Sequence, residues 1–258
     1  MLHTIKNWLN QRIIKQSRVS EEEWQQAFNR LPILKNMSAE ELLRLRKLSI
    51  LFMHDKTFEG AQGQTITSQM CLLISLQACL PILNLGLSCY DNFVSIIVYP
   101  AGFITRRSVT DEFGLVHDEK SHLTGESWQR GPVILAWDEA QIAGEIDGEN
   151  LVIHEFAHKL DMQNGVANGY PPLHANMQNH DWVKAFTIGY EHFKNNCHDN
   201  HLHGINCYGA TSPAEFFAVF SEIFFERPEV LQKHYPDIHH QLVLYYLQDP
   251  LLRFNSDS

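Results

Sequence analysis

Apolar residues recur at helical spacing through the early part of the chain. The segments Glu21 to Leu31 and Ala39 to Leu51 show this period, and both begin with acidic residues. Acidic side chains suit the first turn of a helix, and Ser38 is placed to cap the second segment. The pattern therefore predicts two helices in this region.

The amino terminus, Met1 to Gln16, alternates basic and apolar residues without a continuous apolar core. This pattern predicts an amphipathic helix that packs on its own domain, and it is not that of a secretory signal. Together with the two helices that follow, it indicates a mainly helical segment over residues 1–57, packed on a second part over residues 58–258.

The most apolar stretch runs from Met70 to Leu87. Its length raises the question of a membrane span, but several polar residues and Pro81 interrupt it. Proline ends or kinks a helix, and the sequence on either side resembles that of a soluble protein. We expect a buried core helix that ends near Pro81, and no membrane span.

Two short runs rich in β-branched and aromatic residues predict strands. They are Val94 to Tyr99 and Pro132 to Trp137, each bounded by Pro or Gly. The segment between them from Gly114 to Gly131 is polar and predicts a loop or hairpin, in which His117 and His122 are interpreted as ordinary loop residues. Many helices with a few strands indicate an α+β fold.

Composition narrows the class of protein. The 258 residues carry a formal net charge of −10, which argues against direct nucleic-acid binding because phosphate contacts rely on clustered Lys and Arg. The five cysteines are odd in number and include no C-x-x-C pair. This cysteine usage favours a reducing, cytoplasmic compartment.

One motif specifies a chemistry by its spacing. The chain contains H-E-x-x-H at His154, Glu155 and His158, between a candidate N-cap, Asn150, and a candidate helix-ending glycine, Gly165. Residues four apart on a helix project from one face, with Cβ atoms about 5–6 Å apart. Both imidazoles can therefore bind one zinc ion. Glu155 is placed to accept a proton from the attacking water without binding the metal.

A catalytic zinc takes three protein ligands and keeps a position for water. The extended pattern H-E-x-x-H-x-x-G-x-x-H is absent, because Asp161 and Asn164 stand where its glycine and third histidine would fall. A glutamate from a later helix is the usual alternative. The candidates are Glu191, Glu215, Glu222 and Glu226.

Glu215 also has a local role open to it. In Ser212-Pro213-Ala214-Glu215, serine stands at the N-cap, proline at the first helical position and glutamate at N3, which predicts a capping box. Glu222 follows seven residues later on the same helix face. Either glutamate can enter the site while the other supports it, so spacing alone does not choose between them.

Several strings resemble those of the Mlc titration factor A family of zinc-dependent peptidases. They are His154 to Asp161, Tyr208 to Val219, Gly125 to Trp128 with Gly131 to Trp137, and Cys79 to Leu83. The likeness runs from about Phe58 to Leu251, and it weakens at the amino terminus and across Gly189 to Asn206.

The resemblance implies a zinc metallopeptidase with aminopeptidase-like cleavage of peptide substrates. It implies a zincin-like fold, with a small sheet packed on the H-E-x-x-H helix, and one Zn²⁺ per chain held by His154, His158 and Glu215. The catalytic domain of anthrax lethal factor is related and takes its third ligand in the same way. Tyr208 stands where the family has a tyrosine facing the metal, which makes it a candidate oxyanion stabiliser beside Glu155 as catalytic base.

The same resemblance implies an alternative function and assigns residues 58–258 to the metallopeptidase domain. The family name records binding of the transcription repressor Mlc. The chain is therefore also interpreted as a cytoplasmic regulator that sequesters such a repressor, with or without catalysis.

Three further residues or segments near the motif have interpretations of their own. Asp161 is a candidate to orient a ligating histidine or to form a salt bridge with a basic residue, and Glu222 is a candidate supporting carboxylate. The His-rich stretch from Cys197 to Cys207 is interpreted as a solvated loop rather than a second metal site. Pro132 to Trp137 is the candidate edge strand for an extended substrate.

Overall fold

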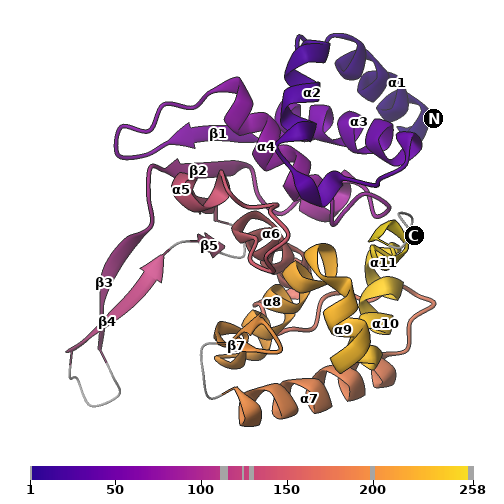
Figure 1. The fold of residues 1–258 in the computed structure, drawn as a ribbon. Coiled ribbons are helices and arrows are strands. Elements are labelled where there is room, and N and C mark those ends of the chain that lie inside the picture. The colour runs from indigo at the N-terminus through magenta and orange to yellow at the C-terminus, as the bar shows by residue number, and fades with distance from the viewer. Residues whose placement is uncertain (1, 111–115, 124, 128–130, 198–200, 255–258) are drawn as a thin grey trace.

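A computed structural model describes residues 2–110, 116–123, 125–127, 131–197 and 201–254. It shows many helices with a four-stranded main sheet and two two-stranded hairpins (Figure 1), so the α+β fold expected from the sequence is confirmed. The helices of the amino-terminal part are α1 (Leu2–Lys15), α2 (Glu21–Asn29), the 3-10 helix η1 (Pro32–Leu34) and α3 (Ala39–Asp55).

The starts of α2 and α3 are set by capping boxes. Ser20 and Ser38 each accept a hydrogen bond from the backbone N–H of the glutamate three residues later, Glu23 and Glu41. Each glutamate carboxylate in turn accepts from the backbone N–H of its serine. The predicted cap at Ser38 is confirmed, and α3 continues past its predicted end at Leu51 to Asp55.

The apolar stretch forms α4 (Ser68–Cys79), which begins at the N-cap Thr67 and is almost entirely buried. The predicted core helix before Pro81 is therefore confirmed. Among the helices in the described part of the chain, none has both the length and the apolar character needed to cross a bilayer. The 3-10 helix η2 (Leu87–Tyr90) follows.

The main sheet has the strand order β1-β2-β6-β5. Its strands are β1 (Thr57–Gly60), β2 (Ser95–Tyr99), β5 (Gly125–Ser127) and β6 (Val133–Ala136). β1, β2 and β6 run parallel, and β5 is antiparallel to β6.

The prediction that Pro132 to Trp137 is an edge strand was wrong. β6 is hydrogen-bonded on both sides, to β2 and to β5, so the edge next to it is β5. Trp137 does not belong to the strand and begins the short helix α5 (Trp137–Ala140). A single strand pattern could not show this, because pairing depends on partners elsewhere in the chain.

An antiparallel hairpin extends away from the rest of the molecule (Figure 1). It consists of β3 (Phe103–Thr110) and β4 (Val116–Leu123), paired from Phe103↔Leu123 to Thr110↔Val116. The sequence predicted a loop or hairpin from Gly114 but did not predict β3. Gly114 and Trp128 lie outside the described residues.

The carboxy-terminal part begins with the H-E-x-x-H helix, α6, against which α8 packs. Its elements are α6 (Leu151–Asp161), η3 (Met162–Asn164), α7 (Asn179–Asn196), β7 (His201–Leu202), β8 (Ile205–Asn206), η4 (Cys207–Ala210), α8 (Pro213–Glu226), α9 (Pro228–His234), α10 (Pro236–Tyr246) and α11 (Leu251–Phe254).

The His-rich stretch before α8 differs from the expected solvated loop. Cys197, directly after α7, forms a disulfide with Cys207 at the start of η4. Between them β7 and β8 pair as a short hairpin. In the described part of this stretch the cysteines form this bond, and no group of three metal-binding side chains is present there; His198 lies outside the described residues.

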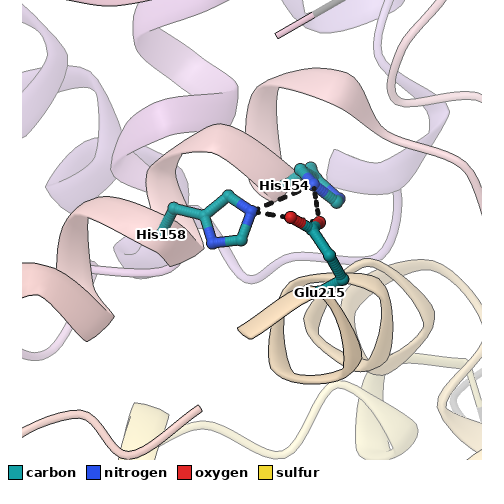
Figure 2. Close-up of side chains that lie close together, drawn as sticks. All are labelled: His154, His158 and Glu215. Atoms are coloured by element: carbon teal, nitrogen blue, oxygen red, sulfur yellow. Dashed lines mark hydrogen bonds and ion pairs between the residues drawn. The ribbon is translucent and has the colours of Figure 1, made fainter. Parts of the chain in front are cut away.

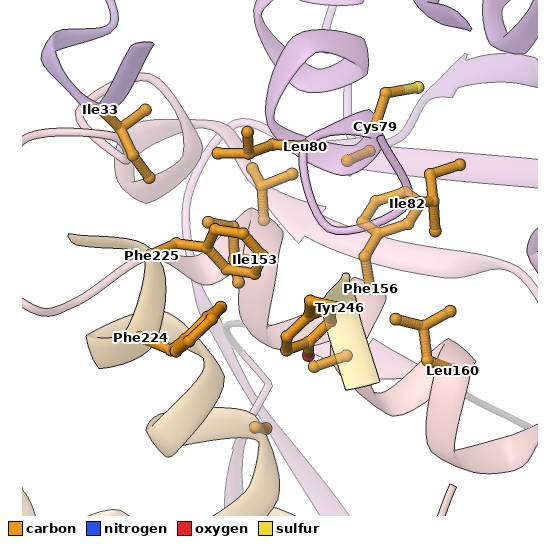
Figure 3. Packing of buried hydrophobic residues seen from close by; sticks show 14 of the residues in the cluster. Ile33, Cys79, Leu80, Ile82, Ile153, Phe156, Leu160, Phe224, Phe225 and Tyr246 are labelled. Carbon is orange, nitrogen blue, oxygen red and sulfur yellow. The ribbon is translucent and has the colours of Figure 1, made fainter. Parts of the chain in front are cut away.

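One hydrophobic core joins the amino-terminal helices to α6 and α8. Figure 3 shows Ile153 of α6 beside Phe225 of α8, and Phe156 of the same helix on the side of Ile82. The Phe52 ring of α3 lies 5.6 Å from the Phe156 ring, centroid to centroid. α6 is thus held directly by the amino-terminal segment, while the division of the chain at residue 57 stays a prediction.

Candidate metal centre

The helix that carries the motif is fixed at both ends. The Asn150 side chain accepts a hydrogen bond from the Ile153 N–H at 2.9 Å, which confirms the predicted N-cap. The helix ends at Asp161, and a 3-10 turn follows it to Gly165, whose φ of 144° suits glycine. Contacts with α4, α8, β5 and β6 surround α6, so the histidine positions cannot shift independently of the core.

The structure brings His154, His158 and Glu215 together (Figure 2). Oε2 of Glu215 lies 3.0 Å from Nε2 of His154 and 3.2 Å from Nε2 of His158. The two Nε2 atoms are 3.2 Å apart. These donor atoms all lie within 4.8 Å of one another, and in the described residues they form the one group of three or more side chains arranged in this way.

The capping interaction of Glu215 is only half formed. The Ser212 hydroxyl accepts from the backbone N–H of Glu215 at 3.2 Å, as the sequence predicted. The carboxylate does not return to the serine as it does in α2 and α3; it points at the two histidines. The local sequence is compatible with a capping role and with a place in the histidine cluster. Tertiary contacts direct the Glu215 side chain to the histidines.

Glu222 contacts the opposite nitrogen of the first histidine. Its Oε1 lies 2.8 Å from Nδ1 of His154, while its Oε2 accepts from the backbone N–H of Asn150. Glu226, one turn later, accepts from the Asn150 side chain at 2.9 Å and from the Gly148 N–H at 2.9 Å. Two carboxylates of α8 therefore hold the start of α6.

Glu155 is 2 % exposed, and its Oε2 has no hydrogen-bond partner among the residues that the structure describes. Burial raises the pKa of its carboxyl, and the nearby histidines oppose that shift. A buried carboxylate oxygen without a partner is costly. Within the described structure this oxygen is therefore an unsatisfied acceptor close to the two histidines.

The charges of the cluster are strongly coupled. Burial lowers the pKa of His154, but its hydrogen bonds to the carboxylates of Glu215 and Glu222 outweigh this effect and raise that pKa well above its usual value. Burial raises the pKa of Glu215, but its hydrogen bonds to both histidines outweigh this and lower it. These opposite pKa shifts favour an ionised Glu215 carboxylate that faces the imidazoles.

Tyr208 lies at the mouth of this cluster. Its ring centroid is 6.0 Å from that of His154, and the side chain is 52 % exposed. Asn206 positions it, because the Asn206 side chain accepts from the Tyr208 N–H at 2.9 Å. Partial burial, with the charges of Glu215 and Glu155, raises its pKa to about 12, so the hydroxyl keeps its proton at neutral pH.

Asp161 contacts the backbone and not a histidine. Its carboxylate accepts from the N–H groups of Asn168, Gly169 and Tyr170 at 2.7–2.9 Å. It has no salt bridge to Lys or Arg in the part of the chain that the structure describes. Asp161 thereby anchors the loop after α6, a contact that its sequence position did not indicate.

The remaining candidate glutamates do not join the group. Glu191 is exposed on α7, and Glu226 contacts Asn150 and Gly148. Two imidazole nitrogens and one carboxylate oxygen form the donor set typical of a metal with an open coordination position. The side chains present fit such a metal, because their donor atoms converge on one point from two helices.

Comparison with known proteins identifies a family that matches most of the chain. The sequence profile of the family described as glucose-regulated metallo-peptidase M90 matches residues 5–247. The match includes the amino-terminal helices, where the likeness recognised in the sequence was weaker. The family resemblance is thus confirmed over more of the chain than expected.

Individual relatives carry the name Mlc titration factor A. The protein of Serratia proteamaculans is 38% identical over 245 residues, which cover 90% of this chain and 88% of that protein. The protein of Cronobacter sakazakii is 37% identical, with 86% and 85% covered. That of Yersinia pestis is 36% identical, with 90% and 86% covered.

Proposed function

The chain belongs to the family of glucose-regulated metallo-peptidases M90, and from this membership and the geometry of the cluster we propose a zinc-dependent peptidase with aminopeptidase-like specificity. The observation that carries the proposal is the convergence of His154, His158 and Glu215 beside the unpartnered carboxylate oxygen of Glu155.

His154, His158 and Glu215 are the proposed metal ligands, with one Zn²⁺ per chain. Zinc is favoured because two imidazoles and a carboxylate, with one position left for water, match catalytic zinc sites. When bound, the metal polarises the substrate carbonyl and lowers the pKa of water to about 7. Glu222 is the proposed positioning residue, because it contacts Nδ1 of His154 and thereby orients the other nitrogen toward Glu215.

Glu155 is the proposed general base. Its buried oxygen accepts a proton from the attacking water and later delivers it to the leaving amine. Burial raises the pKa of this carboxyl, which favours its taking up the proton from water.

Tyr208 is the proposed oxyanion stabiliser. Its hydroxyl remains protonated at neutral pH, because its pKa is raised to about 12, and can therefore donate a hydrogen bond to the carbonyl oxygen as negative charge develops there. Its position over His154 places it on the solvent side of the cluster, where a substrate enters.

We also propose a zincin-like arrangement. β5 and β6 contact α6, and β5 is the strand at the edge of the sheet next to that helix. Asp161 has a structural part in this arrangement, since it holds the loop after α6 through backbone hydrogen bonds.

The test of catalysis compares Glu155→Gln with Glu22→Gln, an exposed acid on α2 that serves as a matched control. Wild type and both variants should bind about one zinc per chain by elemental analysis. Hydrolysis of short peptides by Glu155→Gln should fall by a factor of roughly 10²–10⁴, whereas Glu22→Gln should match wild type. A Glu155→Gln protein with zinc and full activity would show that the mechanism is wrong.

Aminopeptidase-like specificity has its own test. Peptides with a free amino terminus are compared with the same peptides after N-acetylation. The free peptides should be cleaved faster and lose their first residue. Equal cleavage of both sets at internal bonds would identify an endopeptidase instead.

A second function is favoured by the names of the relatives, which describe titration of Mlc. We propose that the chain also binds a transcription repressor of the Mlc type as a protein partner, in the cytoplasm. The net charge of −10 makes the repressor, and not its DNA, the proposed partner. A pull-down with wild type and Glu155→Gln tests this: equal repressor capture by both separates binding from catalysis, and no capture by either argues against it.

A further inference from the structure

A cavity of about 500 Å³ opens beside the candidate metal centre. His154, Glu155 and Tyr208 line one side of it. The other side is formed by α5, by the loop between α5 and α6, and by residues of α8. On the second side the proposed mechanism uses only Glu222, which contacts His154, so the acids of α5 and of the following loop have no part in it.

The second side is strongly acidic. Glu139 of α5 and Asp147 and Glu149 of the following loop line the cavity, and its described lining includes no lysine or arginine. Arg227 packs beside Gly148, but its ion pair is with Glu229, at 3.8 Å. The carboxylates therefore line the cavity without a lysine or arginine in its described lining to neutralise them.

The three acids differ in how well they are paired. Glu149 accepts from the Asn206 side chain at 2.9 Å and lies 3.3 Å from Nε2 of His201. Asp147 accepts from the backbone N–H of Glu149 at 2.9 Å. In the described part of the chain, the carboxylate of Glu139 has neither a hydrogen bond nor an ion pair. Burial, with the charges of Asp138 and Glu149, raises the pKa of Glu139, as expected for like charges without a cation.

The acids are not arranged as a second metal site. In the part of the chain that the structure describes, only His154, His158 and Glu215 bring their donor atoms within 4.8 Å of one another. Carboxylates spread around a cavity of this size suit a larger organic cation instead.

The cavity also has apolar walls. Ile142 is 59 % exposed, and Leu151 and Val219 line the cavity with it. A long aliphatic stem ending in a positive charge matches a wall of this kind next to carboxylates. Glu155, whose buried Oε2 has no hydrogen-bond partner among the described residues, also lines this cavity together with His154, so a ligand there lies next to both the acids and the candidate metal centre.

We propose that this cavity binds the side chain of a lysine or arginine that flanks the cleaved bond of a peptide substrate. The inference rests on the proposed peptidase function and adds the class of residue that the site selects. Glu139 is the principal specificity residue, because its charge lacks a partner within the described protein.

The experiment compares peptides that differ only in charge. Six-residue peptides carry one lysine at each position in turn, and a second series carries norleucine, which keeps the four-carbon aliphatic stem of lysine without the ammonium group. With zinc-loaded wild type, kcat/KM for a lysine next to the cleaved bond should exceed that for norleucine by at least about tenfold, the effect of a charge-assisted hydrogen bond.

Two variants test the residue assignment. Glu139→Lys fills the cavity with a positive charge and should abolish the preference for lysine. Glu145→Gln is the control. It removes an exposed acid that lies in the loop between α5 and α6 and does not line the cavity, so the preference for lysine should keep its wild-type value. Equal cleavage of lysine and norleucine peptides by wild type, or a preference that survives Glu139→Lys, would overturn the inference.

Binding provides a readout that does not depend on turnover. In the Glu155→Gln background, calorimetry should show tighter binding of the lysine peptide than of the norleucine peptide, and Glu139→Lys should remove the difference. If neither series is cleaved but this binding difference is present, the peptidase proposal fails and the cavity assignment stands. If peptides are cleaved and no binding difference exists, the cavity assignment alone fails.

Discussion

The Nδ1 atom of His154 lies 2.8 Å from Oε1 of Glu222. The other oxygen of Glu222 accepts from the backbone N–H of Asn150, the N-cap of α6. One buried carboxylate of α8 thus orients a candidate ligand and also fixes the start of the helix that carries it. Its loss should disturb the metal centre more than the fold.

Replacing Glu222 by glutamine should weaken metal binding. Loss of a carboxylate behind a ligating histidine typically costs about 10–100-fold in affinity, and competition with a chromophoric chelator measures that change directly. Glu229→Gln, on the exposed face of α9, is the control and should bind metal as wild type does. Unchanged affinity in Glu222→Gln would rule out the positioning role.

The two roles open to Glu215 can be separated by substitution. Ser212→Ala removes the cap of α8 and should lower the free energy of unfolding by about 0.5–2 kcal/mol, with metal content retained. Glu215→Gln keeps the cap, which uses the backbone N–H of residue 215, but should reduce metal content sharply. The result to look for is this reciprocal pattern in urea titration and elemental analysis; metal retained by Glu215→Gln contradicts it.

The amino-terminal segment should be required for folding of the rest. Trp24 and Phe52 are fully buried in the core that contains Phe156, so a chain lacking residues 1–57 would expose that face. We expect it to lose cooperative unfolding by calorimetry. Removal of residues 1–15 is the matched comparison and should cost far less, since Trp8 and Leu9 are exposed. A cooperative transition in the shorter chain would show that residues 58–258 fold independently.

Glu226 should make stability depend on pH. Burial raises its pKa from 4.5 to about 8, against the hydrogen bonds from Asn150 and Gly148, and with support from the charges of Glu222 and Asp147. Between these two pKa values, the folded state holds a proton on Glu226 that the unfolded chain has released. The stabilisation from this proton is therefore complete below pH 4.5 and is lost as the pH rises through about 8.

Glu226→Gln cannot bind that proton. Its side chain also has only one acceptor oxygen for the two N–H groups that donate to Glu226. In chelator, to remove the effect of metal, its melting temperature should be below that of wild type at pH 5, and the gap should narrow toward pH 9. A gap of constant size would show that Glu226 does not titrate in this range.

The disulfide can be verified by counting thiols. The chain has five cysteines, of which Cys71, Cys79 and Cys89 are free and Cys197 and Cys207 are bonded. Denatured protein should react with about three equivalents of a thiol reagent before reduction and five after it. Closing a loop of this length stabilises a protein by roughly 2–3 kcal/mol, so reduction should also lower the melting temperature.

The number of reactive thiols also tests the proposed cytoplasmic location. Cytoplasmic thiols are normally kept reduced, so trapping thiols during cell lysis should find all five cysteines of a cytoplasmic protein reactive. Three reactive thiols in freshly trapped protein would place the chain in an oxidising compartment and contradict the proposed cytoplasmic location.

Local features of the sequence predicted local structure well. The caps at Ser38, Asn150 and Ser212 all form, because a capping hydrogen bond involves residues only three apart. The H-E-x-x-H spacing placed His154 and His158 on one helix face for the same reason. The hydrophobic pattern of α4 likewise identified a buried helix, since burial of a whole segment is reflected in its composition.

The sequence by itself determined the helices that correspond to α1–α4, α6 and α8, and the helix face on which two imidazoles can meet. Only the tertiary structure decided that Glu215 turns to those imidazoles, that Glu222 supports His154, that β6 lies inside the sheet and that Cys197 pairs with Cys207. His158 and Glu215 are 57 residues apart in the chain. Capping and ligation by Glu215 are both compatible with its neighbours, so the packing of α8 on α6 supplies the contact that distinguishes them.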